Sequence, residues 1–466
     1  APSLVGVGSR LDEGWMTHWI QNPHKIRPSS RMPALVDSIE DAAHISRYLA
    51  ELKMDRPKHP TPVGNAIKGG ALFAELGCIS CHSITKENAR EDADRLSLLG
   101  VGAKFLPGAL AGFLRAPGQH YPWTRMPDFK LLPAEAADLA AFLRDLAQLL
   151  PRVATISGDL VKGKELFVAR NCAACHESPI KDTRKAPNFS TLAENTEKGC
   201  MANAPEGPRF GFSLTERQEL TSFLRTGGKS LHQHNLQEFA SRQFNELRCM
   251  ACHERDGEDS QWDSFAEEVG AWKYKESDPA VVEDHPERAH RANSTPPSLT
   301  FAGEKLHREW TSSFLAGKIK GKPRPWMLGR MPAFPRRSEL LAEGLARACG
   351  ISKQEPGAEA LKEPEMMKKI GAQIANVLCL TCHGIGSRPP IAVFEGQGIN
   401  LLLSRQRLRK EYYLRWMLNP YRINPATIMP KFADEEGRTG FIDILEGDAK
   451  NQFDAIWRHL DALPTE

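Results

Sequence analysis

Four short runs of cysteine and histidine are the residues of this sequence best suited to chemistry. Each run has the order Cys-x-x-Cys-His, and together they comprise Cys78, Cys81 and His82; Cys172, Cys175 and His176; Cys249, Cys252 and His253; and Cys379, Cys382 and His383. Two thiols three positions apart can each add to a vinyl group of one haem, and the histidine that follows can coordinate its iron. The runs therefore predict four covalently bound haems c.

Structural zinc is the other chemistry that paired cysteines serve. A zinc site combines two Cys-x-x-Cys pairs into one tetrahedral shell of four ligands. Zinc gives no reason for a histidine directly after every second cysteine, so haem attachment is the better interpretation. Outside the runs, Cys200 and Cys349 remain, and they are able to form a disulfide in an oxidising compartment if the fold brings them together.

A Met-Pro pair occurs at four places, beginning at Met32, Met126, Met331 and Met429. A thioether sulfur is a soft ligand that raises the reduction potential of haem iron, and proline stiffens the loop that carries it. A single methionine is more often core filler. Three of these methionines, however, follow a Cys-x-x-Cys-His run, so Met126, Met331 and Met429 are predicted iron ligands.

Helical periodicity frames the runs and the Met-Pro pairs. Apolar residues at helical spacing precede the first and fourth runs, at 72–76 and 370–378, and follow Met-Pro pairs at 45–52, 139–150 and 453–460. Each haem is thus expected to lie between a leading helix and a closing amphipathic helix. The predicted fold class is all-α, a string of small helical domains with long loops.

This arrangement resembles that of class I cytochrome c domains, and the string of domains resembles the multi-domain c cytochromes of planctomycete-type bacteria. The motifs that carry the resemblance extend over nearly the whole chain. The resemblance implies low-spin haems that serve electron transfer, each with a histidine and a methionine as axial ligands. The axial pairs that it implies are His82 with Met126, His253 with Met331, and His383 with Met429.

Polar, proline-containing joints divide the chain into five segments. Residues 56–150, 229–350 and 351–466 each hold a complete set of elements, for the first, third and fourth haems. Residues 151–228 hold the second haem run and a closing helix with a capping box at Ser213 and Glu216, but no Met-Pro pair. Residues 1–55 have a Met-Pro pair and a closing helix without a run, so we expect a haem-less half-domain.

The sixth ligand of the haem at His176 is open. Met201 is the favoured candidate, and Cys200, His232, His234 or an empty position are the alternatives in this part of the chain. Met32 would supply a fourth methionine for the fourth haem. It is less favoured, because an intact module separates it from His176 in the sequence.

An acidic insertion marks the third module. Residues 254–288 hold twelve Asp and Glu against four Lys and Arg. We expect a solvated surface loop there, in preference to a docking surface for a basic partner.

Composition limits the classes of function. A chain of 466 residues accommodates several domains, and a net charge of +3 without a basic, aromatic-rich run gives no reason to expect nucleic-acid binding. No stretch approaches the ~18 apolar residues of a transmembrane helix. The first residues lack the features of a signal peptide, so a targeting segment has been removed or the sequence begins inside a longer precursor. Haem c attachment predicts a periplasmic or otherwise extracytoplasmic location.

The predicted function is electron transfer by a tetrahaem cytochrome, between a periplasmic donor (a dehydrogenase or membrane complex) and an acceptor. Redox proteins are the expected partners, and the chain is also suited to be a subunit of a larger electron-transfer complex. The alternative is a haem enzyme, peroxidase-like or oxidising sulfur compounds, that acts at the haem of His176. That alternative needs an open position or a thiolate at that iron, and no acid–base pair near the run supports it.

Overall fold

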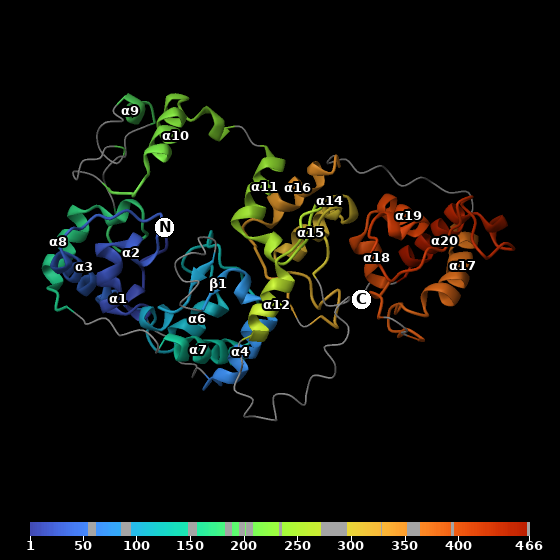
Figure 1. The fold of residues 1–466 in the computed structure, drawn as a ribbon, viewed down its shortest axis with the longest axis horizontal. Helices are drawn as coiled ribbons and strands as arrows, with labels where there is room; N and C mark the ends of the chain where they lie inside the picture. The colour runs from blue at the N-terminus through green and yellow to red at the C-terminus, as the bar shows by residue number, and fades with distance from the viewer. Residues whose placement is uncertain are drawn as a thin grey trace. The chain divides into compact units, whose positions relative to one another are not determined.

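The computed structural model describes the chain as helices joined by long loops (Figure 1). The described residues are 1–54, 62–84, 95–147, 156–181, 189–194, 201, 208–232, 235–271, 296–327, 329–351, 364–392 and 396–463. Within them the named strands are β1 (His82–Ser83) and β2 (Leu96–Ser97), which pair in parallel with His82 opposite Leu96. The all-α prediction is confirmed.

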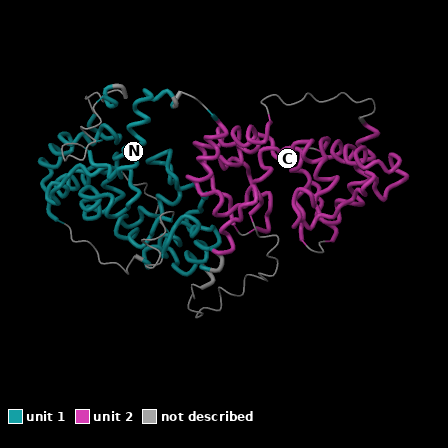
Figure 2. The backbone as a smooth tube through the Cα atoms, turned by 45° about the horizontal axis from the view of Figure 1, so that its top comes forward, with its two compact units in different colours: residues 1–235, 265–275 teal, residues 236–264, 276–466 magenta. Residues whose placement is uncertain are grey.

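The chain divides into two compact units (Figure 2). The first unit consists of residues 1–235 and 265–275, and the second of residues 236–264 and 276–466. Each unit contains two of the Cys-x-x-Cys-His runs.

Four pairs of packed helices form the framework of the two units. The pairs are α4 (Ala66–Glu75) with α7 (Pro133–Ala147), α8 (Leu160–Ala169) with α3 (Ile39–Glu51), α11 (Leu236–Glu246) with α16 (Ser338–Ala348), and α17 (Pro364–Ile374) with α20 (Ala449–Asp461). In three pairs the helix before the haem run meets a later helix. In the second pair, α8 meets a helix that precedes it by more than a hundred residues.

Side-chain caps start these helices where the sequence provides them. Asn65, Asp159 and Asp448 each accept a hydrogen bond from the backbone N–H three residues later, at the start of α4, α8 and α20. Ser38 does the same for α3. Each cap satisfies a donor that has no partner inside the helix, which is typically worth about 1 kcal/mol.

Glycines allow the paired helices to cross at close range. A Cβ atom on Gly69, Gly163 or Gly371 would lie only 2.0, 1.9 and 1.9 Å from a carbonyl oxygen of the partner helix. In the third pair the glycine is on the other helix: Gly344 of α16 faces Ala240 of α11. All four helix pairs therefore have a glycine at the crossing point. It lies on the leading helix in three pairs and on the closing helix in the third.

Residues 1–54 and 156–181 share one hydrophobic core. Phe167 of α8, 1% exposed, packs among buried residues of the N-terminal segment, and its ring lies 5.3 Å from that of Tyr48 on α3. The Asp159 N–H also donates to Nδ1 of His44, at 2.7 Å. From the sequence, these segments were expected in separate modules, 1–55 and 151–228. In the structure both contribute residues to this core.

The helix predicted after residue 212 is present but does not close the second haem module. It is α10 (Leu214–Arg225), it begins with the capping box of Ser213 and Glu216, and it packs on α9 (Phe189–Glu194). Just before it, Arg209 exchanges two backbone hydrogen bonds with Ala34. The position of closing helix against α8 is occupied by α3.

Part of the acidic insertion is helical. In α12 (Trp262–Ala271), Phe265 is 8% exposed and Glu268 forms an ion pair of 2.9 Å with Arg95; all three belong to the first unit. This helix differs from the solvated loop expected there, and residues 272–288 lie outside the described part.

Two further features can be compared with the sequence analysis. Cys349, which follows α16, is a free thiol, whereas Cys200 lies outside the described residues. None of the described helices combines the length and hydropathy needed to cross a membrane.

Candidate haem-binding sites

A sharp turn presents the cysteines of each of the first three runs. Gly77, Asn171 and Arg248 have positive φ angles of 67°, 55° and 56°, and each ends the preceding helix and starts a single 3-10 turn. These turns are Cys78–Ser80, Cys172–Ala174 and Cys249–Ala251. Both cysteines of a run therefore lie on one turn, as attachment to two vinyl groups of one ring requires.

The fourth run is reached differently. A five-residue π-helix, Ala375–Cys379, continues α17 directly into the first cysteine. π-Helical insertions are rare and are often found at functional sites. Here the insertion lets the helix lead into the run without the left-handed residue that the other three modules use.

The histidine of every run is oriented by the same hydrogen bond. Its Nδ1 atom lies within hydrogen-bonding distance of a backbone carbonyl oxygen: 3.2 Å for His82 and Leu96, 2.8 Å for His176 and Pro2, 2.7 Å for His253 and Pro297, and 2.7 Å for His383 and Ile399. When Nδ1–H donates to a carbonyl, the Nε2 lone pair is left for a metal. All four histidines thus share the orientation that a ligand of haem iron would need.

A second hydrogen bond accompanies the first at all four sites. The leucine two residues after the carbonyl donates its N–H to the carbonyl of the residue that follows the histidine. The four bonds are Leu98 to Ser83, Leu4 to Glu177, Leu299 to Glu254 and Leu401 to Gly384, each 2.8 or 2.9 Å long. At His176, both bonds come from the N-terminal segment. Pro2 and Leu4 therefore make the two bonds that, at the other three sites, are made by residues that follow the histidine in the chain.

Burial disfavours the charged form of the histidines. It lowers the pKa of His82 to about 4, and it lowers the pKa values of His176, His253 and His383 as well. A neutral imidazole is the form that coordinates a metal.

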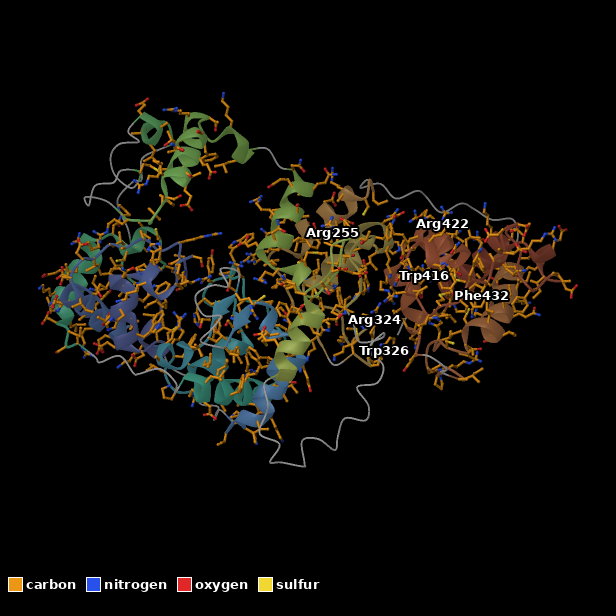
Figure 3. All side chains as sticks on the ribbon, in the orientation of Figure 1. Arg255, Arg324, Trp326, Trp416, Arg422 and Phe432 are labelled. Atoms are coloured by element: carbon orange, nitrogen blue, oxygen red, sulfur yellow. The ribbon has the colours of Figure 1, made fainter. Side chains whose placement is uncertain are left out.

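The sulfur atoms of Met32 and Met429 are held in the same way. Trp19 Nε1 donates to Met32 Sδ at 3.0 Å, and Trp416 Nε1 donates to Met429 Sδ at 2.9 Å, in each case across thirteen positions of the chain. Trp19 lies on α1 (Glu13–Gln21) and Trp416 on α19 (Lys410–Leu418), where it is labelled in Figure 3. Met32 therefore has the surroundings of a predicted ligand.

A backbone turn repeats at three of the Met-Pro pairs. The N–H groups of Met32, Met126 and Met429 donate to a hydroxyl two residues earlier, on Ser30, Thr124 and Thr427, at 3.1 to 3.2 Å. Such turns stiffen the loop in front of the proline.

The remaining Met-Pro pair, at Met331, is more exposed. Met331 is 38% exposed, and Gly329 stands at the position of the hydroxyl residue.

The candidates for the sixth ligand at His176 differ in their surroundings. Met201 is buried, 8% exposed, and is not among the described residues of the core around Phe167. His232 ends a 3-10 helix, Lys229–His232. Its side chain lies outside the described part of the chain, as do Cys200 and His234. Of the candidates within the described residues, Met32 shares a core with this run, because both it and Cys172 pack on the cluster around Phe167.

Sequence reasoning did not identify Pro2, Trp19 or His44 as parts of the second site. A signal was present: Pro2-Ser3-Leu4 is repeated as Pro297-Ser298-Leu299, and the second copy follows a haem run in the ordinary order. The donor sets fit haem c, since each combines two thiols on one turn with a histidine whose Nε2 is available.

Comparisons with known proteins agree with this chemistry. The cytochrome c family model matches residues 66–147 and 160–209. No curated protein and no solved structure matches the chain. The first matched segment spans α4, the run of His82, Met126 and α7, and the second begins at α8 and contains the run of His176. The chain is therefore a c-type cytochrome with cytochrome c-like domains.

Proposed function

We propose that this cytochrome is a tetrahaem electron-transfer protein, with one haem c bound at each of the four runs. Cytochrome c domains carry covalent haem and transfer electrons, and two segments match that family. The observation that carries the number four is the repeated pair of hydrogen bonds around each histidine. This pair of bonds fixes the orientation of the imidazole ring, which a domain needs when its histidine is a ligand.

The second haem module is built from two separate pieces of chain in this proposal. Residues 156–181 supply the leading helix, Cys172, Cys175 and His176, and residues 1–54 supply the methionine loop and the closing helix. Met32 is then the sixth ligand in place of Met201. The common core, the hydrogen bond from His176 to Pro2 and the bond from Trp19 to the Met32 sulfur support this assignment.

The other three modules keep the axial pairs that the sequence suggests, with Met126, Met331 and Met429 as sixth ligands. Bound haem iron supplies a one-electron change between the ferric and ferrous states. The protein's residues orient the imidazoles, hold the sulfurs and exclude water from the core. A methionine ligand also keeps the potential higher than a second histidine would.

Redox proteins outside the cytoplasm are the proposed partners, with a periplasmic dehydrogenase or membrane complex as donor. Cytochrome c domains are typically extracytoplasmic, because their thioether bonds are made there. The proposal leaves no open iron position at His176, which a peroxidase-like activity would need.

Two measurements on the purified full-length chain test the proposal. Intact mass is expected to show four haem additions, and the resting absorption spectrum is expected to be low-spin with a methionine-to-iron charge-transfer band. Fewer than four additions would refute the haem count. A high-spin component of about one haem in four, together with peroxide turnover, would instead favour the enzyme.

A further inference from the structure

Each unit joins two haem modules through the same backbone bridge. In the first unit Leu11 pairs antiparallel with Phe105, flanked by hydrogen bonds from Asp12 N to Lys104 O (3.0 Å) and from Leu106 N to Arg10 O (2.9 Å). In the second unit the bridge is Leu306 to Leu408. Its flanking bonds, both 2.9 Å, run from His307 N to Arg407 O and from Arg409 N to Lys305 O.

A cation immediately precedes each of the four bridging residues. These are Arg10 and Lys104 in the first unit and Lys305 and Arg407 in the second. Within each unit one cation comes from each module, and the two lie diagonally across the bridging pair. They are close enough for Arg10 to lower the pKa of Lys104 and for Arg407 to lower that of Lys305. We call Arg10, Lys104, Lys305 and Arg407 the bridge cations.

The two lysines lie over aromatic rings of the opposite module. Lys104 Nζ is 4.9 Å from the ring centroid of Trp15 on α1, and Lys305 Nζ is 5.5 Å from that of Tyr412 on α19. Trp15 and Tyr412 hold corresponding positions, four residues before the tryptophan that binds the methionine sulfur. The two interfaces therefore agree in side chains as well as in backbone.

The bridge cations lie in surroundings that oppose their charge. Burial, followed by neighbouring positive charges, lowers the pKa of Lys104 to about 8, that of Lys305 to about 7 and that of Arg407 to about 10. The buried Nε atom of Arg407 has no hydrogen-bond partner among the described residues. No carboxylate in the described part of the chain offsets these charges. Buried positive charge that no carboxylate neutralises is costly unless an anion binds.

A third cation adds to each group. Arg27, on the segment that carries Met32, lowers the pKa of Lys104 and, after burial, that of His82 in the opposite module. Arg324 acts in the same way on Lys305 and Arg407. Figure 3 shows Arg324 beside Trp326, on the loop between α15 (Arg308–Leu315) and α16.

We propose that the bridge cations bind haem propionates from both modules of a unit, so that the four haems form two electrostatically coupled pairs. The inference rests on the proposed function. Each haem brings two propionates, so one pair brings four negative charges to a group of three cations. The first pair consists of the haems at His176 and His82, and the second of those at His253 and His383.

A shared cation group predicts a shared effect on potential. Removing one positive charge stabilises the ferric form relative to the ferrous form, which lowers the reduction potential of any haem close enough to feel it. Lys104→Gln should therefore lower the potentials of two haems and leave two unchanged. Lys305→Gln should lower the potentials of the other two.

The test is a spectroelectrochemical titration of the full-length holoprotein and its variants, resolved into four components. Lys104→Arg, which keeps the charge, should leave all four potentials close to their original values. Lys162→Gln is the matched surface control, because that lysine side chain is 55% exposed. A downward shift of two components in each bridge variant supports the pairing, and a shift of none, one or all four overturns it.

Haem incorporation provides a second readout if a variant is loaded incompletely. Peptide mapping of Lys104→Gln should then show loss at both Cys78 and Cys172, and loss at only one of them would also overturn the pairing. Intact mass of the unmodified protein separates the two proposals. A chain with four haems whose potentials shift one at a time retains the proposed function and loses only the pairing.

Discussion

The second and the fourth haem modules show how little the order of the chain matters to this fold. In the fourth module the leading helix, the run of His383, the methionine loop and the closing helix follow one another within residues 364–463. In the second, we propose that residues 156–181 supply the leading helix and run while residues 1–54, which share a core with them, supply the rest. Both use the same carbonyl-to-histidine bond and the same tryptophan-to-sulfur bond.

The point at which the second module is interrupted explains why this is tolerated. The carbonyl partner of the histidine follows it by 14 residues in the first module, 44 in the third and 16 in the fourth. That connection already varies threefold in length, and loop length changes stability only slowly. In the second module the same partner, Pro2, lies 174 residues away along the chain. A module is therefore defined by its core contacts. The length of chain that connects its two halves can vary widely.

The largest effect is expected from removing the methionines. Met32→Ala and Met429→Ala should each remove about a quarter of the methionine-to-iron charge-transfer band and lower the potential of one haem, because one iron in four loses its sulfur ligand. Near-infrared absorption and redox titration measure this.

Met201→Ala is the matched control for these variants, since Met201 is also buried. It should leave the band intact. If Met201→Ala removes the band and Met32→Ala does not, the comparison between the two modules fails.

Crossing glycines give the next largest effect. Gly163→Ala and Gly371→Ala place a methyl group about 1.9 Å from a carbonyl oxygen of the partner helix, so each should destabilise its module by about 1–3 kcal/mol. Thermal or denaturant unfolding of the holoprotein measures the change.

Gly112 of α6 (Ala109–Arg115) is the control, because a Cβ there meets nothing within 4 Å. Gly112→Ala should be neutral or stabilising by about 0.5–1 kcal/mol. A tolerated Gly163→Ala beside a damaging Gly371→Ala would show that α3 and α8 do not pack as closely as α17 and α20.

A smaller effect is expected from the tryptophans. Trp19→Phe and Trp416→Phe remove the N–H donor to sulfur and keep the ring, at a cost of about 0.5–1.5 kcal/mol each. The sulfur then donates more charge to iron, so the potential of the second or fourth haem should fall. The first and third modules carry Phe113 and Phe314 on the corresponding helices, and their potentials should not change. Equal shifts at all four haems would argue against a local effect.

The smallest effect concerns the turn before the methionine. Ser30→Ala and Thr427→Ala remove the hydroxyl that accepts the methionine N–H, and each should lower stability by about 0.5–1 kcal/mol without changing the axial ligand. Unfolding measurements with the charge-transfer band as probe test both points. Loss of the band at room temperature would mean that the turn is needed for ligation itself.

The sequence predicted local chemistry well, and longer-range relations only in part. The all-α fold, the capping box at Ser213 and the amphipathic helices follow from residues a few positions apart, and the structure contains them. The role of the helix after Ser213 was misjudged, because adjacency in the chain was used as a guide to packing. Its place against α8 belongs to α3, which shares Phe167 and Tyr48 with it.

The covalent attachment points were predicted from the sequence alone, because two thiols and a histidine within five residues need no tertiary structure to be recognised. Only the tertiary structure shows that Pro2 bonds to His176 and that Met32 shares a core with Cys172, because these contacts join segments far apart in the sequence. It also decided that Arg10 and Lys104, or Lys305 and Arg407, lie close together on the two sides of a backbone bridge. Uncompensated charge is a property of surroundings in three dimensions, and only the folded chain brings these residues together.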